Sequence, residues 1–285
     1  DNETLKCILL DQVLTKKVMG IKIAWCPGGP IVQCDNSKNG IDALEKFQEV
    51  IFEEKIFNLR CKPYMSDISK NQKIFSNISK STYTFTSSKS ILLKIVSDDE
   101  FLQQVKKKHR YSIKQSEKSG LTWKRCSGSD TAKVFSSVHD EMQENKNLKL
   151  PIIDIAVFEK ILNANKDNVS RLFTFAGFEN NNPVSVCLIS ILGNKAFYHY
   201  AASTERGREL SASYGMIFNL VRELRNLSIE ELDFGGVSTD ESSSGVDFFK
   251  HGFNGQVFNK IGEFDIAKST LYSSFFSNVL RLKNK

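Results

Sequence analysis

The segment that decides the fold reads FYHYAA at 197–202, ELDFGG at 231–236 and GVDFFKHGF at 245–253. The first two stretches have the aromatic and apolar composition of strands, and residues 213–225 between them repeat apolar side chains at helical spacing. The second strand runs into Asp233 and a glycine pair, which predicts a turn with positive φ or a close backbone approach. Ligands of open α/β sheets bind at such strand ends, so this turn is a candidate site edge. The alternative is that Asp233 only caps a turn before a flexible loop.

Lys250 directly follows two phenylalanines. A lysine that aromatic rings partly desolvate favours a bound anion or a developing oxyanion as its partner. The alternative is a core aromatic pair whose neighbouring lysine extends its amine into water.

Composition bounds the class of protein. The 285 residues are 40% hydrophobic and 11% aromatic, enough for one large domain or two modest ones. No apolar run is long enough to span a membrane, so a soluble protein is expected. The net charge of +6 is mild, and affinity for nucleic acid or anionic lipid must come from local patches. The six cysteines form no CxxC pair, which argues against a zinc site or a disulfide scaffold and favours a reducing compartment.

The rest of the chain alternates strands and helices. Three antiparallel strands are predicted at 169–178, 184–191 and 196–202, and a helix at 153–164 precedes them. Residues 65–88 have no clear pattern and predict a long surface connection. The domain boundary is expected near Ser97. The fold class is therefore α+β, with mixed, mostly antiparallel sheets flanked by helices.

One helix, predicted over 98–119, has an unusual charge pattern. Its basic residues form a stripe that recurs at every fourth position, at Lys106, Arg110, Lys114 and Lys118, with Lys107 beside them. Like charges at this spacing repel weakly. The stripe is either a solvated surface or the contact for a polyanion.

Side-chain alternation along the strand at 196–202 predicts that Tyr198 and Tyr200 share one face. They either form a half-buried sheet face or line an acceptor site. His199 is expected on the other face, in packing.

Five motifs in this order resemble the Fem-type peptidyltransferases, the methicillin-resistance factor family, which are relatives of the GNAT-type N-acyltransferases. The motifs are PGGPIV at 27–32, KKHRYSI at 107–113, YHYAAS at 198–203, DFGG at 233–236 and FKHGF at 249–253. The resemblance implies two GNAT-type lobes. The first would span 1–97, incomplete at its start and completed by a helix at 266–285, and the second 98–265.

The resemblance also implies a reaction. The aminoacyl ester of a charged tRNA would be attacked by a free amine of a nucleotide- or lipid-linked muropeptide, in the cytoplasm or at the inner face of the membrane. No metal or redox cofactor is needed, because the ester is already activated. Lys250 would stabilise the oxyanion, Phe249 would exclude water, and Asp233 would orient groups or accept a proton. The substrate-binding residues implied are Lys107, Arg110 and Lys114 for phosphates, Tyr198 and Tyr200 for the acceptor, and Gly235 and Gly236 at the site edge.

Two features bear on the identity of the donor. The turn at 206–213 lacks the glycine-rich spacing that cradles the pyrophosphate of coenzyme A, which disfavours acyl-CoA as donor. The coiled-coil arm of some family members is also missing, and such an arm is a plausible contact for tRNA. One alternative is an acyl-CoA or thioester-dependent N-acyltransferase acting on an amino sugar or peptide. Another is a non-catalytic protein that binds RNA or a membrane surface. The sequence leaves the oligomeric state open.

Overall fold

A computed structural model describes residues 7–18, 20–84, 86–146, 155, 170–238 and 245–268. The helices predicted at 153–164 and 266–285 lie outside these residues, apart from Ile155 and the first three positions of the second range. The chain divides into two compact units, residues 1–89 with 258–285, and residues 90–257. The chain passes from one unit to the other at 89–90 and at 257–258, which is earlier than the predicted boundaries after 97 and 265.

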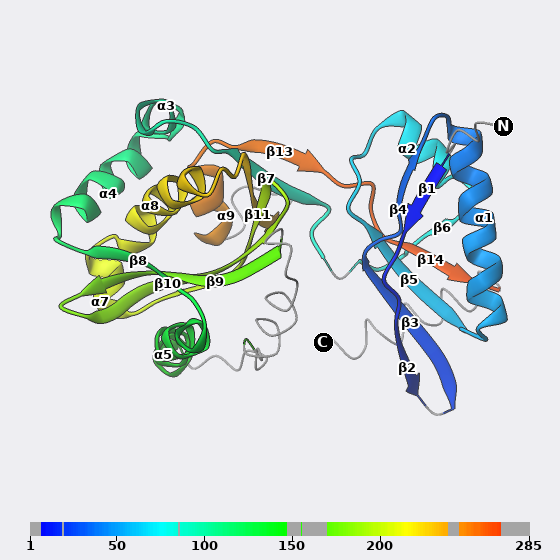
Figure 1. Cartoon of the computed structure of the whole chain (residues 1–285), viewed down its shortest axis with the longest axis horizontal. Helices are drawn as coiled ribbons and strands as arrows, with labels where there is room; N and C mark the ends of the chain where they lie inside the picture. The colour runs from blue at the N-terminus through cyan, green and yellow to red at the C-terminus, as the bar shows by residue number, and fades with distance from the viewer. Residues whose placement is uncertain are drawn as a thin grey trace. The chain divides into compact units, whose positions relative to one another are not determined.

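The second unit is built on a seven-stranded sheet (Figure 1). In spatial order its strands are β13 (Gln256–Asn259), β7 (Lys89–Lys94), β12 (Glu231–Val237), β11 (Lys195–Ser203), β10 (Asn182–Leu192), β9 (Ser170–Glu179) and β8 (Thr122–Cys126). The run from β8 to β11 is antiparallel, whereas β11 and β12 are parallel. Parallel neighbours need a crossover, and the chain between them supplies α7 (Glu205–Glu209) and α8 (Ala212–Asn226). The predicted α+β class is confirmed.

Helices cover both faces of this sheet. On one face α8 buries Met216, Leu220 and Leu224 against the strands, in the company of α3 (Asp98–Gln104), α4 (Lys107–Lys118) and α9 (Gly245–His251) (Figure 1). On the other face α5 (Ser129–Lys146) packs Phe135 and Val138 against the sheet. The helical spacing of these apolar residues is what makes each helix one-sided.

The single helix predicted over 98–119 is wrong, because the chain breaks at Val105, whose ψ of 135° is extended. Backbone groups near the break find other partners. The amide of Lys106 donates to the carbonyl of Gly252 at 2.9 Å, and Arg110 Nη1 donates to the carbonyl of Leu102 at 3.0 Å. Because the backbone groups at these two helix ends form hydrogen bonds outside their own helix, a break between the helices leaves them paired. The chain therefore forms two separate helices, α3 and α4.

The parallel pair at the centre of the sheet is short. Its ladder joins Lys195–Phe197 to Glu231–Asp233, and both strands continue beyond it. On the side that pairs with β10, β11 carries a β-bulge, since Leu188 pairs with Tyr200 but Ile189 pairs with Tyr198. His199 is the extra residue, and the bulge lies just past the point where the parallel ladder ends.

The first unit holds a five-stranded sheet in the order β2 (Leu14–Val18), β3 (Ile21–Gly28), β5 (Asn58–Pro63), β14 (Phe264–Ala267) and β6 (Ser79–Lys80). It also contains a pair of strands, β1 (Cys7–Leu10) and β4 (Ile31–Cys34), and two helices, α1 (Ser37–Glu53) and α2 (Ser69–Ile74). The surface connection predicted for 65–88 is wrong, because this stretch includes α2 and β6 and buries Met65, Ile74, Phe75 and Ile78. Isolated apolar residues among polar ones concealed its contribution to the core.

A buried ion cluster lies in this sheet. Arg60 on β5 is 1% exposed and donates through Nε to Asp265 Oδ1 at 2.6 Å and through Nη2 to Oδ2 at 3.0 Å. Its Nη1 reaches the carbonyl of Tyr83 at 2.7 Å and Glu263 Oε2 at 3.3 Å. The arginine thus joins β5 to β14 across two carboxylates.

Within the described residues, no helix is both long enough and apolar enough to cross a membrane.

Candidate functional site

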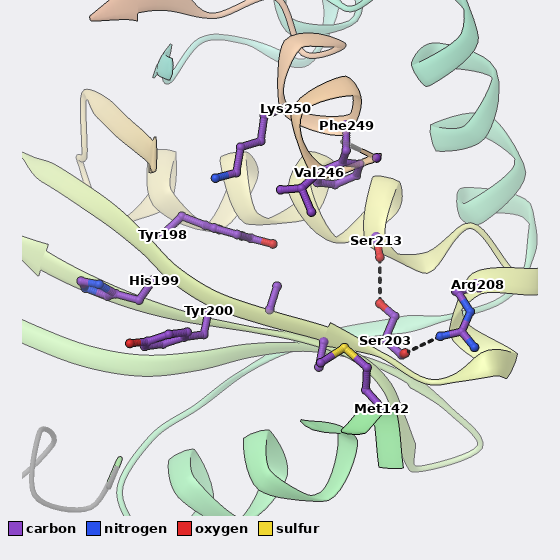
Figure 2. A pocket seen from close by; sticks show the side chains of 13 residues that line it. Met142, Tyr198, His199, Tyr200, Ser203, Arg208, Ser213, Val246, Phe249 and Lys250 are labelled. Carbon is purple, nitrogen blue, oxygen red and sulfur yellow. Dashed lines mark hydrogen bonds between the residues drawn. The ribbon is translucent and has the colours of Figure 1, made fainter. Parts of the chain in front are cut away.

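A cavity of about 510 Å³ opens in the second unit beside the end of the parallel ladder (Figure 2). Residues 198–203 of β11 form one wall, and Val246, Phe249 and Lys250 of α9 form another. Arg208 and Ser213 complete it near the start of α8. The cavity therefore lies where β11 extends beyond its pairing with β12.

Lys250 is the cation of the α9 wall. Its Nζ donates to the carbonyl of Gly236 at 2.8 Å and lies 6.0 Å from the centre of the Phe234 ring. Figure 2 shows the amine directed from α9 toward Tyr198. The two motifs DFGG and FKHGF, separate in the sequence, are thus brought together at the amine.

The stretch of β12 beside this amine requires glycine. Gly235 has φ of +82°, and a Cβ there would lie 3.3 Å from Lys250 Nζ and 3.4 Å from the carbonyl oxygen of Tyr198. A side chain at this position would strain the backbone and press on both groups. The predicted positive φ is confirmed at Gly235, but the predicted end of the strand at the glycine pair is wrong, because β12 continues through both glycines to Val237.

Phe249 forms the dry side of the site. Its ring lies 5.1 Å from Tyr214, 5.1 Å from Phe253 and 5.9 Å from Phe234, measured between ring centres. Phe253 and Phe234 are fully buried, so Phe249 extends the core up to the cavity wall. Such a wall lowers the local dielectric beside Lys250, which strengthens any charge interaction there.

Asp233 is buried at 6% exposure and is not among the cavity-lining residues. Its Oδ1 accepts the amide of Gly235 at 2.8 Å, and its Oδ2 lies 3.5 Å from Ser90 Oγ. Of the two roles that the sequence left open, this geometry supports orientation of the β12 backbone at Gly235 rather than proton transfer.

The prediction that Tyr198 and Tyr200 share a face is wrong. Tyr198 pairs with Ile189 and packs on the α8 side, whereas Tyr200 pairs with Leu188, whose side chain lies in the α5-side core. The bulge at His199 adds one residue and so reverses the alternation. Both tyrosines still line the cavity, and burial raises the pKa of the Tyr198 hydroxyl well above its usual value.

His199 is likewise not packed as predicted. It is exposed, lines the cavity, and its Nε2 lies 2.6 Å from Ser190 Oγ.

The basic stripe on α4 does not line the cavity. Lys107 and Lys114 are exposed, and neither has a carboxylate partner among the described residues. Arg110 instead bonds to the Leu102 carbonyl and so helps to hold α3 against α4. The stripe is a separate surface of the second unit.

Sequence reasoning missed the polar end of the cavity. Ser203 Oγ lies 2.7 Å from Ser213 Oγ and 2.9 Å from Ser185 Oγ, and Arg208 Nη1 donates to the Ser203 carbonyl at 3.2 Å. Arg206, the other arginine of this turn, is held by Glu179 and Glu209 at 2.6 and 2.9 Å. The available signal was a basic turn directly after an aromatic strand. In the described part of the chain, no three His, Cys, Asp or Glu side chains gather as metal ligands.

Comparisons with known proteins point to one family. Residues 155–277 match the FemAB family. Lipid II:glycine glycyltransferases from two strains of Staphylococcus epidermidis are 31% identical over 94 residues, which is 31% of this chain and 23% of theirs. The chain therefore spans about a quarter of the length of these curated relatives.

Solved structures extend the likeness. The crystal structure of FemX superposes with a TM-score of 0.77 at 17% identity, covering 97% of this chain and 88% of the other. A tandem GNAT protein from the clavulanic acid biosynthesis pathway gives 0.52 at 13% identity, covering 93% and 85%. These likenesses show the fold, and the predicted pair of GNAT-type lobes is confirmed. The Fem-type resemblance predicted from the motifs is confirmed as well: residues 155–277 match the FemAB family, and the chain has the fold of FemX.

Proposed function

We propose that this protein is an aminoacyltransferase that forms an amide on a free amine of a peptidoglycan precursor. The observation that carries the proposal is the placement of Lys250 at the cavity wall, between Phe249 and the glycine pair Gly235–Gly236 of β12. The likeness to glycyltransferases that act on lipid II supports this class of acceptor.

The proposed reaction needs little beyond positioning and charge. The acceptor amine attacks the carbonyl carbon of an aminoacyl ester, a C–N bond forms, and the carbonyl oxygen becomes an oxyanion. The ester C–O bond then breaks, and the leaving oxygen takes the proton that the amine gives up and becomes a hydroxyl. Lys250 donates to the oxyanion, while Phe249 keeps water from the ester. Asp233 holds the backbone of β12 at Gly235, beside the amine.

The donor in this proposal is a charged tRNA. The exposed lysines of α4, including Lys107 and Lys114, supply the charge that a phosphate backbone requires. The acceptor in this proposal is a lipid- or nucleotide-linked muropeptide, and the reaction takes place in the cytoplasm or at the inner face of the membrane.

A transfer assay tests the proposal. Purified protein is incubated with lipid II and, in parallel, with labelled glycyl-tRNA or labelled acetyl-CoA. Label that reaches lipid II from the tRNA supports the proposal. Label that arrives only from acetyl-CoA would replace it with a coenzyme A-dependent N-acyltransferase. A set of other aminoacyl-tRNAs and a nucleotide-linked muropeptide complete the assay, and transfer from none of these donors to either acceptor would overturn it.

The surface of α4 can be tested on its own. Lys107→Gln and Lys114→Gln in one chain should weaken tRNA binding and reduce its salt dependence. A matched control is Lys16→Gln with Lys17→Gln, two exposed lysines of the first unit. Equal effects of both pairs would remove α4 from the donor contact.

A further inference from the structure

His109 connects α4 to the helix that carries Lys250. The side chain is 1% exposed, and its Nε2 lies 3.0 Å from the carbonyl oxygen of Phe249. A carbonyl only accepts, so Nε2 carries the hydrogen and the ring is the donor. Phe249 immediately precedes Lys250, and the bond therefore fixes the backbone next to the cation.

Aromatic contacts hold the ring of His109 in place. It meets Tyr214 and Phe253 edge-on, with ring centres 4.9 and 5.3 Å apart, and lies 5.3 Å from Phe248. Gly252 permits this approach, because a Cβ there would lie 1.9 Å from Nε2. The imidazole is thus packed against residues on both sides of Lys250.

A second bond joins the same elements. The amide of Lys106, just before α4, donates to the carbonyl of Gly252 at 2.9 Å, just after α9. Helix α9 has only seven residues, and a helix of this length has little stability of its own. Its position therefore depends on what it packs against.

We propose that His109 is a positioning residue for Lys250: by donating to the Phe249 carbonyl it fixes α9 so that the amine points at the Gly236 carbonyl and the cavity. The inference rests on the proposed function for its catalytic consequence. It goes beyond that function because His109 does not line the cavity and would act only through Lys250.

Two substitutions separate the bond from the packing. His109→Leu fills much of the same space but has no donor, whereas His109→Gln restores an N–H that can reach the carbonyl. Misplacement of a catalytic group by about 1 Å can cost about 100-fold in rate. We expect His109→Leu to lower kcat by about this factor with KM little changed, and His109→Gln to recover most of the loss.

Ile113→Val is the matched control, because Ile113 lies on α4, one turn after His109, and is also 1% exposed. It loosens the packing without touching the bond, so kcat should stay at the wild-type value even where the thermal midpoint falls. If Ile113→Val lowers kcat as much as His109→Leu, or if His109→Leu keeps full kcat, the positioning role is wrong.

A spectroscopic readout keeps this test independent of the reaction. Lysines are dimethylated with ¹³C, which leaves each amine one N–H, and the Lys250 signal is assigned with Lys250→Arg. The Phe234 ring, 6.0 Å from Nζ, should shift that signal away from those of exposed lysines. His109→Leu should move it toward them and His109→Gln should not. An unchanged signal in His109→Leu overturns the inference, whereas absence of transfer by the wild type overturns only the proposed function.

Discussion

Each unit of the molecule holds one prominent cation in or beside its sheet, and the two differ in what surrounds them. Arg60 in the first unit is enclosed, and its guanidinium meets the buried carboxylates of Asp265 and Glu263. Lys250 in the second unit is only half-buried, and its amine lies on a cavity wall beside the glycine pair of β12.

The difference separates structural from functional charge. A buried cation with bidentate carboxylates ties strands together, and no ligand can reach it. A cation at the edge of an aromatic cluster, facing open volume, is still able to meet an incoming anion. Arg60 should therefore govern stability and Lys250 activity. Substitutions at or near each cation can show whether stability and activity separate in this way.

The largest effect is expected for Arg60→Leu. Removal of the guanidinium leaves two carboxylates buried without their cation, which costs about 3–5 kcal/mol. Urea unfolding followed by circular dichroism measures the loss. Arg60→Lys keeps the charge but loses the guanidinium group that binds both oxygens of Asp265, so its stability should lie between that of the wild type and that of Arg60→Leu. Full stability in Arg60→Leu would contradict the structural role.

Lys250→Met should have the opposite signature. We expect kcat to fall by about 10²- to 10³-fold, since a donor to the developing oxyanion is lost. The unfolding midpoint should stay close to that of the wild type, because the amine is half-exposed. Wild-type turnover in this variant would remove Lys250 from the mechanism.

Gly235→Ala should give a smaller, mixed effect. Forcing a Cβ into this left-handed conformation costs about 1–2 kcal/mol and also displaces the amine of Lys250. Gly193→Ala is the matched control, since Gly193 has φ of +60° but a Cβ there would meet nothing within 4 Å. If both variants lose a similar amount of stability but only Gly235→Ala loses turnover, the effect on activity comes from the position of the Lys250 amine. Equal turnover would show that the amine tolerates the shift.

The smallest effect concerns pH. Burial lowers the pKa of His109, and the neighbouring charges of Lys106 and Lys108 lower it further, against the bond to Phe249. The unfolded chain therefore binds this proton more readily than the folded one. The contribution of His109 is complete above its unfolded pKa of about 6.5 and is lost as the pH falls toward the lower folded pKa.

Urea midpoints measured at about pH 7.5 and about pH 5.5 should differ more in the wild type than in His109→Gln. An identical difference in both chains would show that His109 does not titrate with folding.

The sequence predicted the elements well where periodicity is long. The apolar stripe of α8 and the antiparallel strands β9, β10 and β11 lie where they were expected. The sequence also predicted part of the site, because Gly235, Phe249 and Lys250 belong to motifs rich in glycine and aromatic residues.

Three features escaped because their causes are not local. The bulge at His199 depends on how β10 pairs, and no glycine or proline marks it. The break at Val105 depends on Gly252, far along the chain, which accepts the Lys106 amide. The partner of Arg60 is 205 residues away on β14, and a strand pattern cannot reveal which strand will lie beside it.

The carbonyl of Gly236 also affects how strongly Lys250 would bind the substrate compared with the tetrahedral intermediate. An ammonium has three N–H donors, and this carbonyl takes one of them at 2.8 Å. A fixed acceptor on one donor orients the remaining two without removing the charge. An ester carbonyl in the ground state gains little from such a group, whereas a full oxyanion gains a charged partner already in place. The proposed enzyme would therefore bind the tetrahedral intermediate more tightly than its substrate, and this preference would come from a backbone oxygen that never contacts either.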